Sequence, residues 1–104
     1  MSPADKQGGL RVDRRPGGVT VVTIEGQDKV NSLGERDHHD LAAIWPALDA
    51  DPQVRVIVVT GQGRAFCAGG SMAMEQRLAG DYAGITQTMA DARDLVNNMI
   101  SCDK

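Results

Sequence analysis

The sequence predicts an α/β fold with a pair of parallel strands, and three observations lead to this prediction. Residues 19–25 (VTVVTIE) and 54–60 (VRVIVVT) are rich in β-branched residues, as strands are. The second run is nearly continuous in Val and Ile, which is typical of a strand covered on both faces. Between the two runs, apolar residues recur at the spacing of one helix face: Leu41, Ile44, Trp45 and Leu48. A strand, a crossover helix and a second strand in this order predict parallel pairing.

The residues before the first of these strands predict a hairpin. Residues 10–14 (LRVDR) alternate between apolar and polar, as a half-buried strand does, and RPGG at 15–18 is a strong turn signal. We therefore expect residues 10–14 to pair antiparallel with 19–25. Residues 1–9 are polar and contain a Gly pair and a Pro, so we expect a flexible leader, with the domain itself spanning 10–104.

The start of the crossover helix is marked by a possible capping box. Ser32 and Glu35 have the S-x-x-E spacing of this motif, which predicts a helix from near Leu33 to near Ala50. Pro46 removes one intrahelical donor, so we expect it to kink the last turns.

Two further helices are expected toward the end of the chain, a short one near 70–78 and a longer one near 82–101. The longer helix is predicted by an apolar stripe that we assign to core or subunit packing: Ile85, Met89, Ala92, Val96 and Met99 or Ile100.

Length and composition exclude several classes of function. A chain of 104 residues is long enough for one domain with a modest core. A net charge of −3, with one Trp, one Tyr and one Phe, argues against a nucleic-acid partner. No apolar run approaches the roughly 18 residues of a membrane-spanning helix, and the first residues lack a signal peptide's apolar stretch, so we expect no membrane association and a cytoplasmic location. Cys67 and Cys102 are expected to be reduced thiols.

The most unusual stretch is GQGRAFCAGGSM at 61–72, which places four glycines and two alanines after a strand. Small residues let a backbone come close to a ligand or to another chain segment. Ligands bind at such a position in parallel α/β sheets, where loop amides and a helix N-terminus point outward. The loop is not a Walker loop and lacks the third glycine of a dinucleotide fingerprint. A plain tight turn is the alternative.

Three segments together carry a family resemblance: VTVVTIEG, KVNSL and VRVIVVTGQGRAFCAGGSM. With their spacing, they resemble the N-terminal part of the enoyl-CoA hydratase/isomerase family, also called the crotonase family. The resemblance covers 10–104, and its most specific piece is G-x-G-x-A-F-x-A-G-G. It implies a crotonase-like spiral of strand-strand-helix units, of which this chain holds the N-terminal half. It also implies an acyl-CoA thioester substrate, with coenzyme A as part of the substrate and no other cofactor or metal, and a homo-oligomer (trimer or hexamer) in the full-length form.

The resemblance also assigns roles to individual residues. Family members stabilise a thioester enolate with two backbone N–H groups that form an oxyanion hole, and the N–H of Ala68 is expected to be one donor. Arg64 is expected either to meet a CoA phosphate or to lie on the solvated surface. Family members commonly have Asp where this chain has Ser71, which puts the loop geometry in question. The residues expected to bind the substrate are Lys29, Val30, Ala65, Ala68, Gly69, Gly70 and Ser71.

The family's catalytic carboxylates and second oxyanion donor lie later in its sequence than this chain extends. We therefore expect a fragment of a longer hydratase (a lyase) or isomerase of fatty acid metabolism, without its catalytic acids. Glu75 is the acid nearest the loop, but nothing in the sequence places a second carboxylate beside it. The alternatives are a non-catalytic module that binds CoA or a protein, and a small nucleotide-binding domain.

Two other features suggest chemistry less strongly. Residues 37–40 (DHHD) look like a metal cluster, but adjacent helical residues point about 100° apart, so a solvated helix face is favoured. Cys67 lies in the loop with no His near it in sequence, so a small, partly buried thiol is favoured over a nucleophile.

Overall fold

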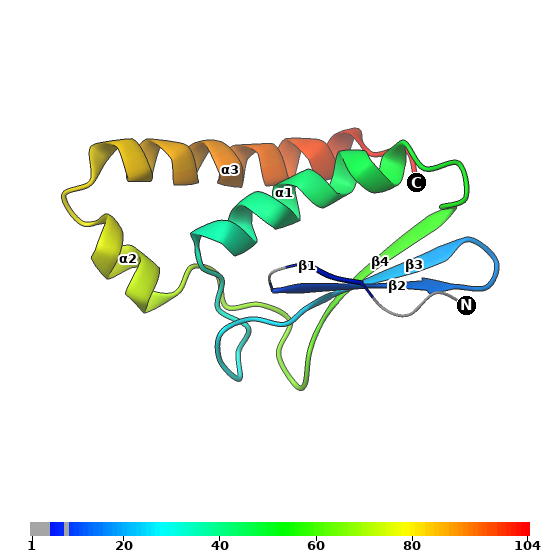
Figure 1. The fold of residues 1–104 in the computed structure, drawn as a ribbon, viewed down its shortest axis with the longest axis horizontal. Helices are drawn as coiled ribbons and strands as arrows, with labels where there is room; N and C mark the ends of the chain where they lie inside the picture. The colour runs from blue at the N-terminus through cyan, green and yellow to red at the C-terminus, as the bar shows by residue number, and fades with distance from the viewer. Residues whose placement is uncertain (1–4, 8) are drawn as a thin grey trace.

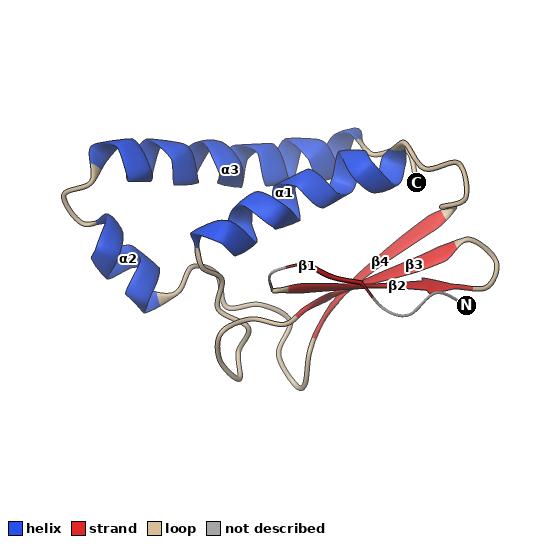
Figure 2. Cartoon of the chain, in the orientation of Figure 1, coloured by secondary structure: helices blue, strands red, loops and turns tan. Residues whose placement is uncertain are grey.

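A computed structural model describes residues 5–7 and 9–104, and in it four strands form one sheet in the order β1-β2-β3-β4 (Figure 1). Three helices complete the fold, and Figure 2 shows α1 and α3 side by side on one side of the sheet. The elements in chain order are β1 (Asp5–Gln7), β2 (Leu10–Arg15), β3 (Val19–Ile24), α1 (Glu35–Asp49), β4 (Val56–Gly61), α2 (Met72–Leu78) and α3 (Tyr82–Ser101).

The predicted strand pairings are confirmed. β2 and β3 are antiparallel, joined by a turn in which Gly17 and Gly18 have φ values of 82° and 81° that favour glycine. β3 and β4 are parallel, with Val19 opposite Val56 and Ile24 opposite Gly61, and α1 lies in the crossover between them. The glycine loop therefore leaves the carboxyl end of a parallel strand, as the sequence predicts.

Part of the expected flexible leader belongs to the sheet. Residues 1–4 and 8 lie outside the described residues, but β1 pairs antiparallel with β2. The prediction for 5–7 was wrong because backbone pairing needs no apolar side chains.

The prediction that the valine-rich strand is covered on both faces was also wrong. β4 pairs only with β3 among the described strands, so it is an edge of the sheet. Val56 and Val58 on one face keep 48% and 42% of their surface exposed, whereas Ile57 and Val59 on the other pack against the core. The buried core lies between this face and the helices, and its members are Leu10, Val22, Ile24, Leu33, Leu41, Leu48 and Val54.

Helix α1 begins two residues later than predicted, because Asp37 caps it. The N-cap is Gly34, whose N–H donates to Asp37 Oδ2 at 3.0 Å. The other carboxylate oxygen of Asp37 accepts from the Gly9 N–H at 3.0 Å. Ser32 instead donates its backbone N–H to Asp28. A buried carboxylate thus satisfies two backbone donors and joins the helix start to the sheet.

Pro46 lies inside α1, which continues past it to Asp49. Proline has no N–H, so the carbonyl four residues earlier, that of Ala42, loses its helical partner. That carbonyl accepts a hydrogen bond from Asn98 Nδ2 of α3 at 2.9 Å. The proline therefore helps to define where α3 packs.

Helix α3 has the predicted limits, but it packs through a different face. The members of the predicted apolar stripe Ile85, Met89, Val96, Met99 and Ile100 are exposed. The face that packs on α1 includes the polar residues Asp91 and Asn98 beside the apolar Leu95. Helical spacing identified the helix correctly. The stripe does not belong to the core of this chain, and its assignment to subunit packing stays a prediction.

Candidate functional site

The segments that connect β3 to α1 and β4 to α2 lie beside each other and form an open cleft of about 750 Å³. Residues 26–30 line one wall and residues 62–65 line the other. The sequence-predicted site residues Lys29, Val30 and Ala65 are all in this lining, although Ala65 lies 35 positions after Val30 in the chain.

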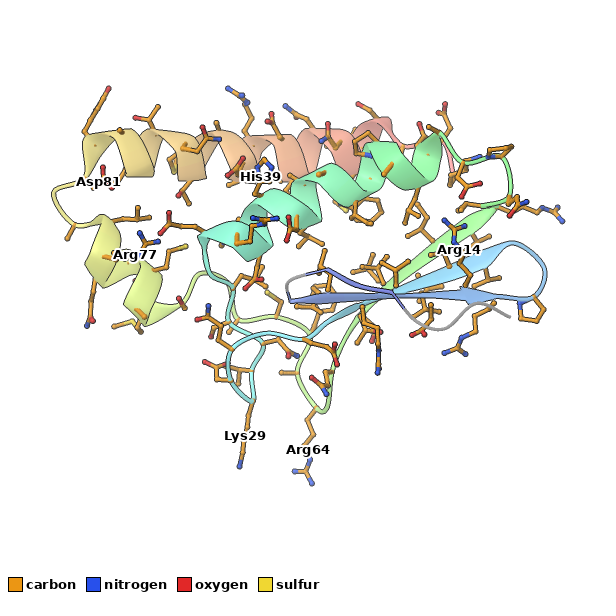
Figure 3. All side chains as sticks on the ribbon, viewed as in Figure 1. Arg14, Lys29, His39, Arg64, Arg77 and Asp81 are labelled. Atoms are coloured by element: carbon orange, nitrogen blue, oxygen red, sulfur yellow. The ribbon has the colours of Figure 1, made fainter. Side chains whose placement is uncertain are left out.

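The cleft carries two cations at its outer edge. Figure 3 shows that Lys29 and Arg64 project from the tips of the two loops in the same direction, away from the helices. The one carboxylate in the lining is that of Asp28, which accepts from the backbone N–H groups of Val30 and Ser32 at 3.1 Å each. The bond from Ser32 lowers the pKa of Asp28 below its ordinary value, so this carboxylate is ionised. The lining holds two cations, Lys29 and Arg64, and one anion, Asp28, so the net charge of the cleft is positive.

Asn31 holds the two walls together, although it was not among the predicted site residues. It is 2% exposed and has a φ of 57°, a conformation that Asn tolerates better than most residues. Its side-chain oxygen accepts from the Gly26 N–H at 3.1 Å. Its Nδ2 lies 2.9 Å from the Gln62 carbonyl and 2.8 Å from that of Ala65, with the Phe66 carbonyl at 3.3 Å. The signal that could have found it is an Asn between a strand and a helix, where such residues form turns.

Two glycines of the loop are required for different reasons, Gly61 for close packing and Gly69 for its backbone conformation. A Cβ built at Gly61 would lie 2.2 Å from the carbonyl oxygens of Ala65 and Phe66, so the chain can fold back only on a glycine there. Gly69 has a φ of 99°, which strains other residues.

The backbone of the loop pairs with the segment before α1. Leu33 donates to the Gly69 carbonyl and accepts from the Ser71 N–H, both at 2.8 Å. The Ala68 N–H donates to the Val30 carbonyl at 2.9 Å. The predicted role of Ala68 as an oxyanion donor stays a prediction, and this geometry opposes it, because the N–H already has an acceptor.

Gly70 presents its backbone differently. It is the centre of a parallel bridge with Leu33, in which only the flanking residues 69 and 71 bond to Leu33. The N–H of the central residue of such a bridge points away from the partner segment. Within the part of the chain that the structure describes, no hydrogen bond joins the Gly70 N–H to an acceptor.

Ser71 is the N-cap of α2, at the position where family members commonly have Asp. Its buried hydroxyl accepts from the Met74 N–H at 3.1 Å, so it caps the helix as an Asp would. An ion pair between Arg77 and Glu35 links α2 to the start of α1. The short helix predicted after Gly70 is therefore confirmed.

A second cavity of about 670 Å³ lies on the other side of the loop, between the core face of β4 and the helices α1 and α3. Its lining is mostly apolar, and Gly69 and Cys67 reach it from the loop. Cys67 is half-buried, as expected, and its sulfur accepts from the Gly69 N–H at 3.4 Å. The other lining residues are Ile24, Leu33, His38, Leu41, Trp45, Ile57, Val59, Phe66, Ala92, Leu95, Val96 and Met99.

The DHHD segment is not the solvated face that was predicted. Asp37 and Asp40 are buried, the former as a cap and the latter in a bond with Arg36. His38 lines the apolar cavity, and His39 lies on the α3 side, where its Nδ1 is 3.2 Å from Asp91. The described residues contain no group of three or more possible metal ligands. None of their helices is long and apolar enough to cross a membrane.

The sequence of this chain is similar to known proteins of one family. Residues 14–104 match the model of the family described as enoyl-CoA hydratase/isomerase. The chain is 43% identical over 54 residues to a mevalonyl-coenzyme A hydratase of Beauveria bassiana, and 40% identical over 55 residues to an (E)-benzylidenesuccinyl-CoA hydratase of Thauera aromatica. Each match covers 52% of this chain and about a fifth of the relative (19% and 22%).

A solved structure shows the same fold. An enoyl-CoA hydratase/isomerase from Mycobacterium paratuberculosis is 35% identical, with a TM-score of 0.84 over 94% of this chain and 39% of that protein. The predicted α/β architecture, the N-terminal part of the crotonase fold, is thereby confirmed.

Proposed function

The chain belongs to the enoyl-CoA hydratase/isomerase family, and from this premise we propose that it forms the part of an acyl-CoA enzyme that binds the coenzyme A thioester. The observation that carries the proposal is the arrangement of the two hollows around one loop. A cleft edged by the cations Lys29 and Arg64 lies on one side of 61–70, and an apolar cavity without a Lys or Arg in its lining lies on the other. A fatty acyl-CoA has the same division into a charged end and an apolar end.

In the proposed complex, the phosphates of coenzyme A lie near Lys29 and Arg64 at the edge of the cleft. Both cations are exposed and neither has an ion-pair partner among the described residues, so each is free to meet a phosphate oxygen. The remainder of the CoA arm follows Val30 and Ala65 toward Gly69, and the acyl chain enters the apolar cavity.

The thioester oxygen then lies at the loop backbone. We place the oxyanion donor of this chain at the N–H of Gly70, since the neighbouring N–H groups of Ala68 and Ser71 already donate to carbonyls. A donor aimed at a developing negative oxygen typically lowers the barrier by about 3 kcal/mol. Water addition to a 2-enoyl thioester and double-bond migration both pass through such an enolate, and this chain supports either reaction equally.

Binding affinity tests the proposal. Isothermal titration of the 104-residue chain with crotonyl-CoA, at low salt, is expected to give saturable binding that weakens roughly 2- to 5-fold in Lys29→Ala and in Arg64→Ala. Arg93→Ala is the matched control, because Arg93 is an exposed cation of α3 that pairs with Asp94, outside the cleft lining. A preference for ATP or NAD over CoA would contradict the proposal.

The position of the donor has its own measurement. In an NMR amide-exchange experiment, the paired Ala68 N–H is expected to exchange slowly and that of Gly70 quickly, and crotonyl-CoA is expected to slow exchange at Gly70. Fast exchange at Ala68, with protection there on ligand binding, would return the role to Ala68.

A non-catalytic binding module is the second candidate, and the exposed valine face and free edge of β4 favour it. Hydration of crotonyl-CoA by this chain and by a form extended at its C-terminus distinguishes the two. Activity in the longer form supports the enzyme, and activity in neither supports the module.

A further inference from the structure

We propose that His38 is a catalytic residue of this site, and that its Nε2 exchanges a proton with the carbon next to the thioester carbonyl. The inference rests on the proposed function, because it requires the thioester at the glycine loop. His38 is not among the residues proposed to bind coenzyme A.

The hydrogen bond of His38 leaves one ring nitrogen available. Its Nδ1 lies 3.0 Å from the carbonyl oxygen of Gly34. A carbonyl only accepts, so Nδ1 carries the hydrogen, and in the neutral ring the lone pair is on Nε2. Among the described residues only Nδ1 of this ring is hydrogen-bonded. The first turn of α1 thus fixes both the orientation of the ring and the nitrogen that can act as a base.

The ring also lies beside the proposed oxyanion donor. A Cβ built at Gly70 would be 3.8 Å from His38 Cε1 and 3.9 Å from Glu75 Oε1. Nε2 is bonded directly to Cε1, so the free nitrogen is at most one bond farther away. His38 is half-buried and lines the cavity proposed for the acyl chain, where Gly69 and Cys67 are also found. The α-carbon of a thioester is two bonds from its carbonyl oxygen, so an oxygen held by the Gly70 N–H places that carbon within the same small region.

The proposed step balances without another reactant. The Cα–H bond breaks and its proton forms an N–H bond at Nε2, while the electron pair moves into the thioester carbonyl to give an enolate. The Gly70 N–H stabilises the negative oxygen. The imidazolium exchanges its proton with solvent and returns one to the same carbon. In D₂O the net result is replacement of C–H by C–D.

The neighbouring histidine provides a matched control. His39 is 61% exposed and its Nδ1 contacts Asp91 on the α3 side, so it lies outside the cavity lining. Two variants separate chemistry from folding at position 38. His38→Asn retains a donor for the Gly34 carbonyl but has no base, and His38→Ala opens a space that added imidazole can enter.

The test measures deuterium exchange at the α-carbon of butyryl-CoA in D₂O by proton NMR, with binding of butyryl-CoA followed separately by titration. The 104-residue chain and His39→Ala are expected to accelerate exchange over buffer. His38→Asn and His38→Ala are expected to lose about 10²-fold or more of that rate, with unchanged thermal unfolding, and imidazole is expected to restore exchange in His38→Ala alone.

Three results would overturn the inference. Binding of butyryl-CoA without accelerated exchange removes the catalytic role and leaves the proposed function intact. Exchange by His38→Asn at the rate of the unchanged chain assigns the base elsewhere. Absence of butyryl-CoA binding contradicts the proposed function and the inference together.

Discussion

Replacing Asn31 with alanine is expected to destabilise the chain and to open the proposed CoA cleft. The amide group of Asn31 has two N–H bonds, which the carbonyls of Gln62 and Ala65 occupy at 2.9 and 2.8 Å, and its oxygen accepts from Gly26. The contact with Phe66 at 3.3 Å shares one of these hydrogens. Alanine therefore removes three hydrogen bonds, each with a net value of about 1 kcal/mol.

The backbone adds to this cost. With a φ of 57°, position 31 is in the left-handed region, where alanine is disfavoured by roughly 1 kcal/mol. The expected loss is about 4 kcal/mol in the free energy of unfolding, a large share of the roughly 5–15 kcal/mol of a typical domain. Urea unfolding followed by circular dichroism measures it.

Two further variants at position 31 separate the contributions. Asn31→Gly keeps the backbone conformation and loses only the side-chain bonds, so it should cost less than alanine. Asn31→Asp keeps the acceptor for Gly26 but directs a carboxylate at the carbonyls of 62 and 65, so it should cost about as much as alanine at pH 7. A loss below about 1 kcal/mol for alanine would refute the idea that this side chain joins the two walls.

Three other perturbations follow from single contacts. Asn98→Ala removes the donor of the Ala42 carbonyl and should lower the free energy of unfolding by about 1 kcal/mol, whereas an unchanged urea midpoint would mean that water satisfies this carbonyl. Gly61→Ala places a Cβ 2.2 Å from two carbonyl oxygens and should cost about 1–3 kcal/mol and weaken CoA binding, so a variant that binds normally would show the loop to be adaptable. The bond from Ser32 lowers the pKa of Asp28 from 3.8, so the stability it provides is complete above that pH and is lost as the pH falls below it. The difference in unfolding free energy between Asp28→Ala and the unchanged chain should thus shrink between pH 7 and pH 3, and a constant difference would contradict the assignment.

Features that depend on short-range pattern were predictable from the sequence. The turn at RPGG and the limits of α3 follow from residues close together in the chain, and the parallel strand pair follows from the order strand, helix, strand. The position of the glycine loop at the end of a strand follows in the same way. The family motif then indicated which loop residues to expect at a ligand site.

Features that depend on contacts with residues distant in the sequence could not be predicted in this way. A run of valines is the same whether a strand is interior or, like β4, an edge. The apolar stripe of α3 identified a helix, but the face that packs is decided by specific polar partners such as Asn98 and the carbonyl left free by Pro46. The cap of α1 was misassigned because Asp37, two residues after the expected Glu35, reaches both Gly34 and Gly9.

The proposal of Gly70 in place of Ala68 as the oxyanion donor follows from backbone alternation. In an extended segment, successive N–H groups point to opposite sides. Once the residues flanking Gly70 are bonded to Leu33, the N–H of Gly70 must face away from that segment. The motif shows that the loop is small enough to meet a ligand, but it does not show which amides the protein itself uses. The pairing of the loop with Val30 and Leu33 fixes its backbone, and the same pairing leaves the N–H of Gly70 available for the proposed oxyanion role.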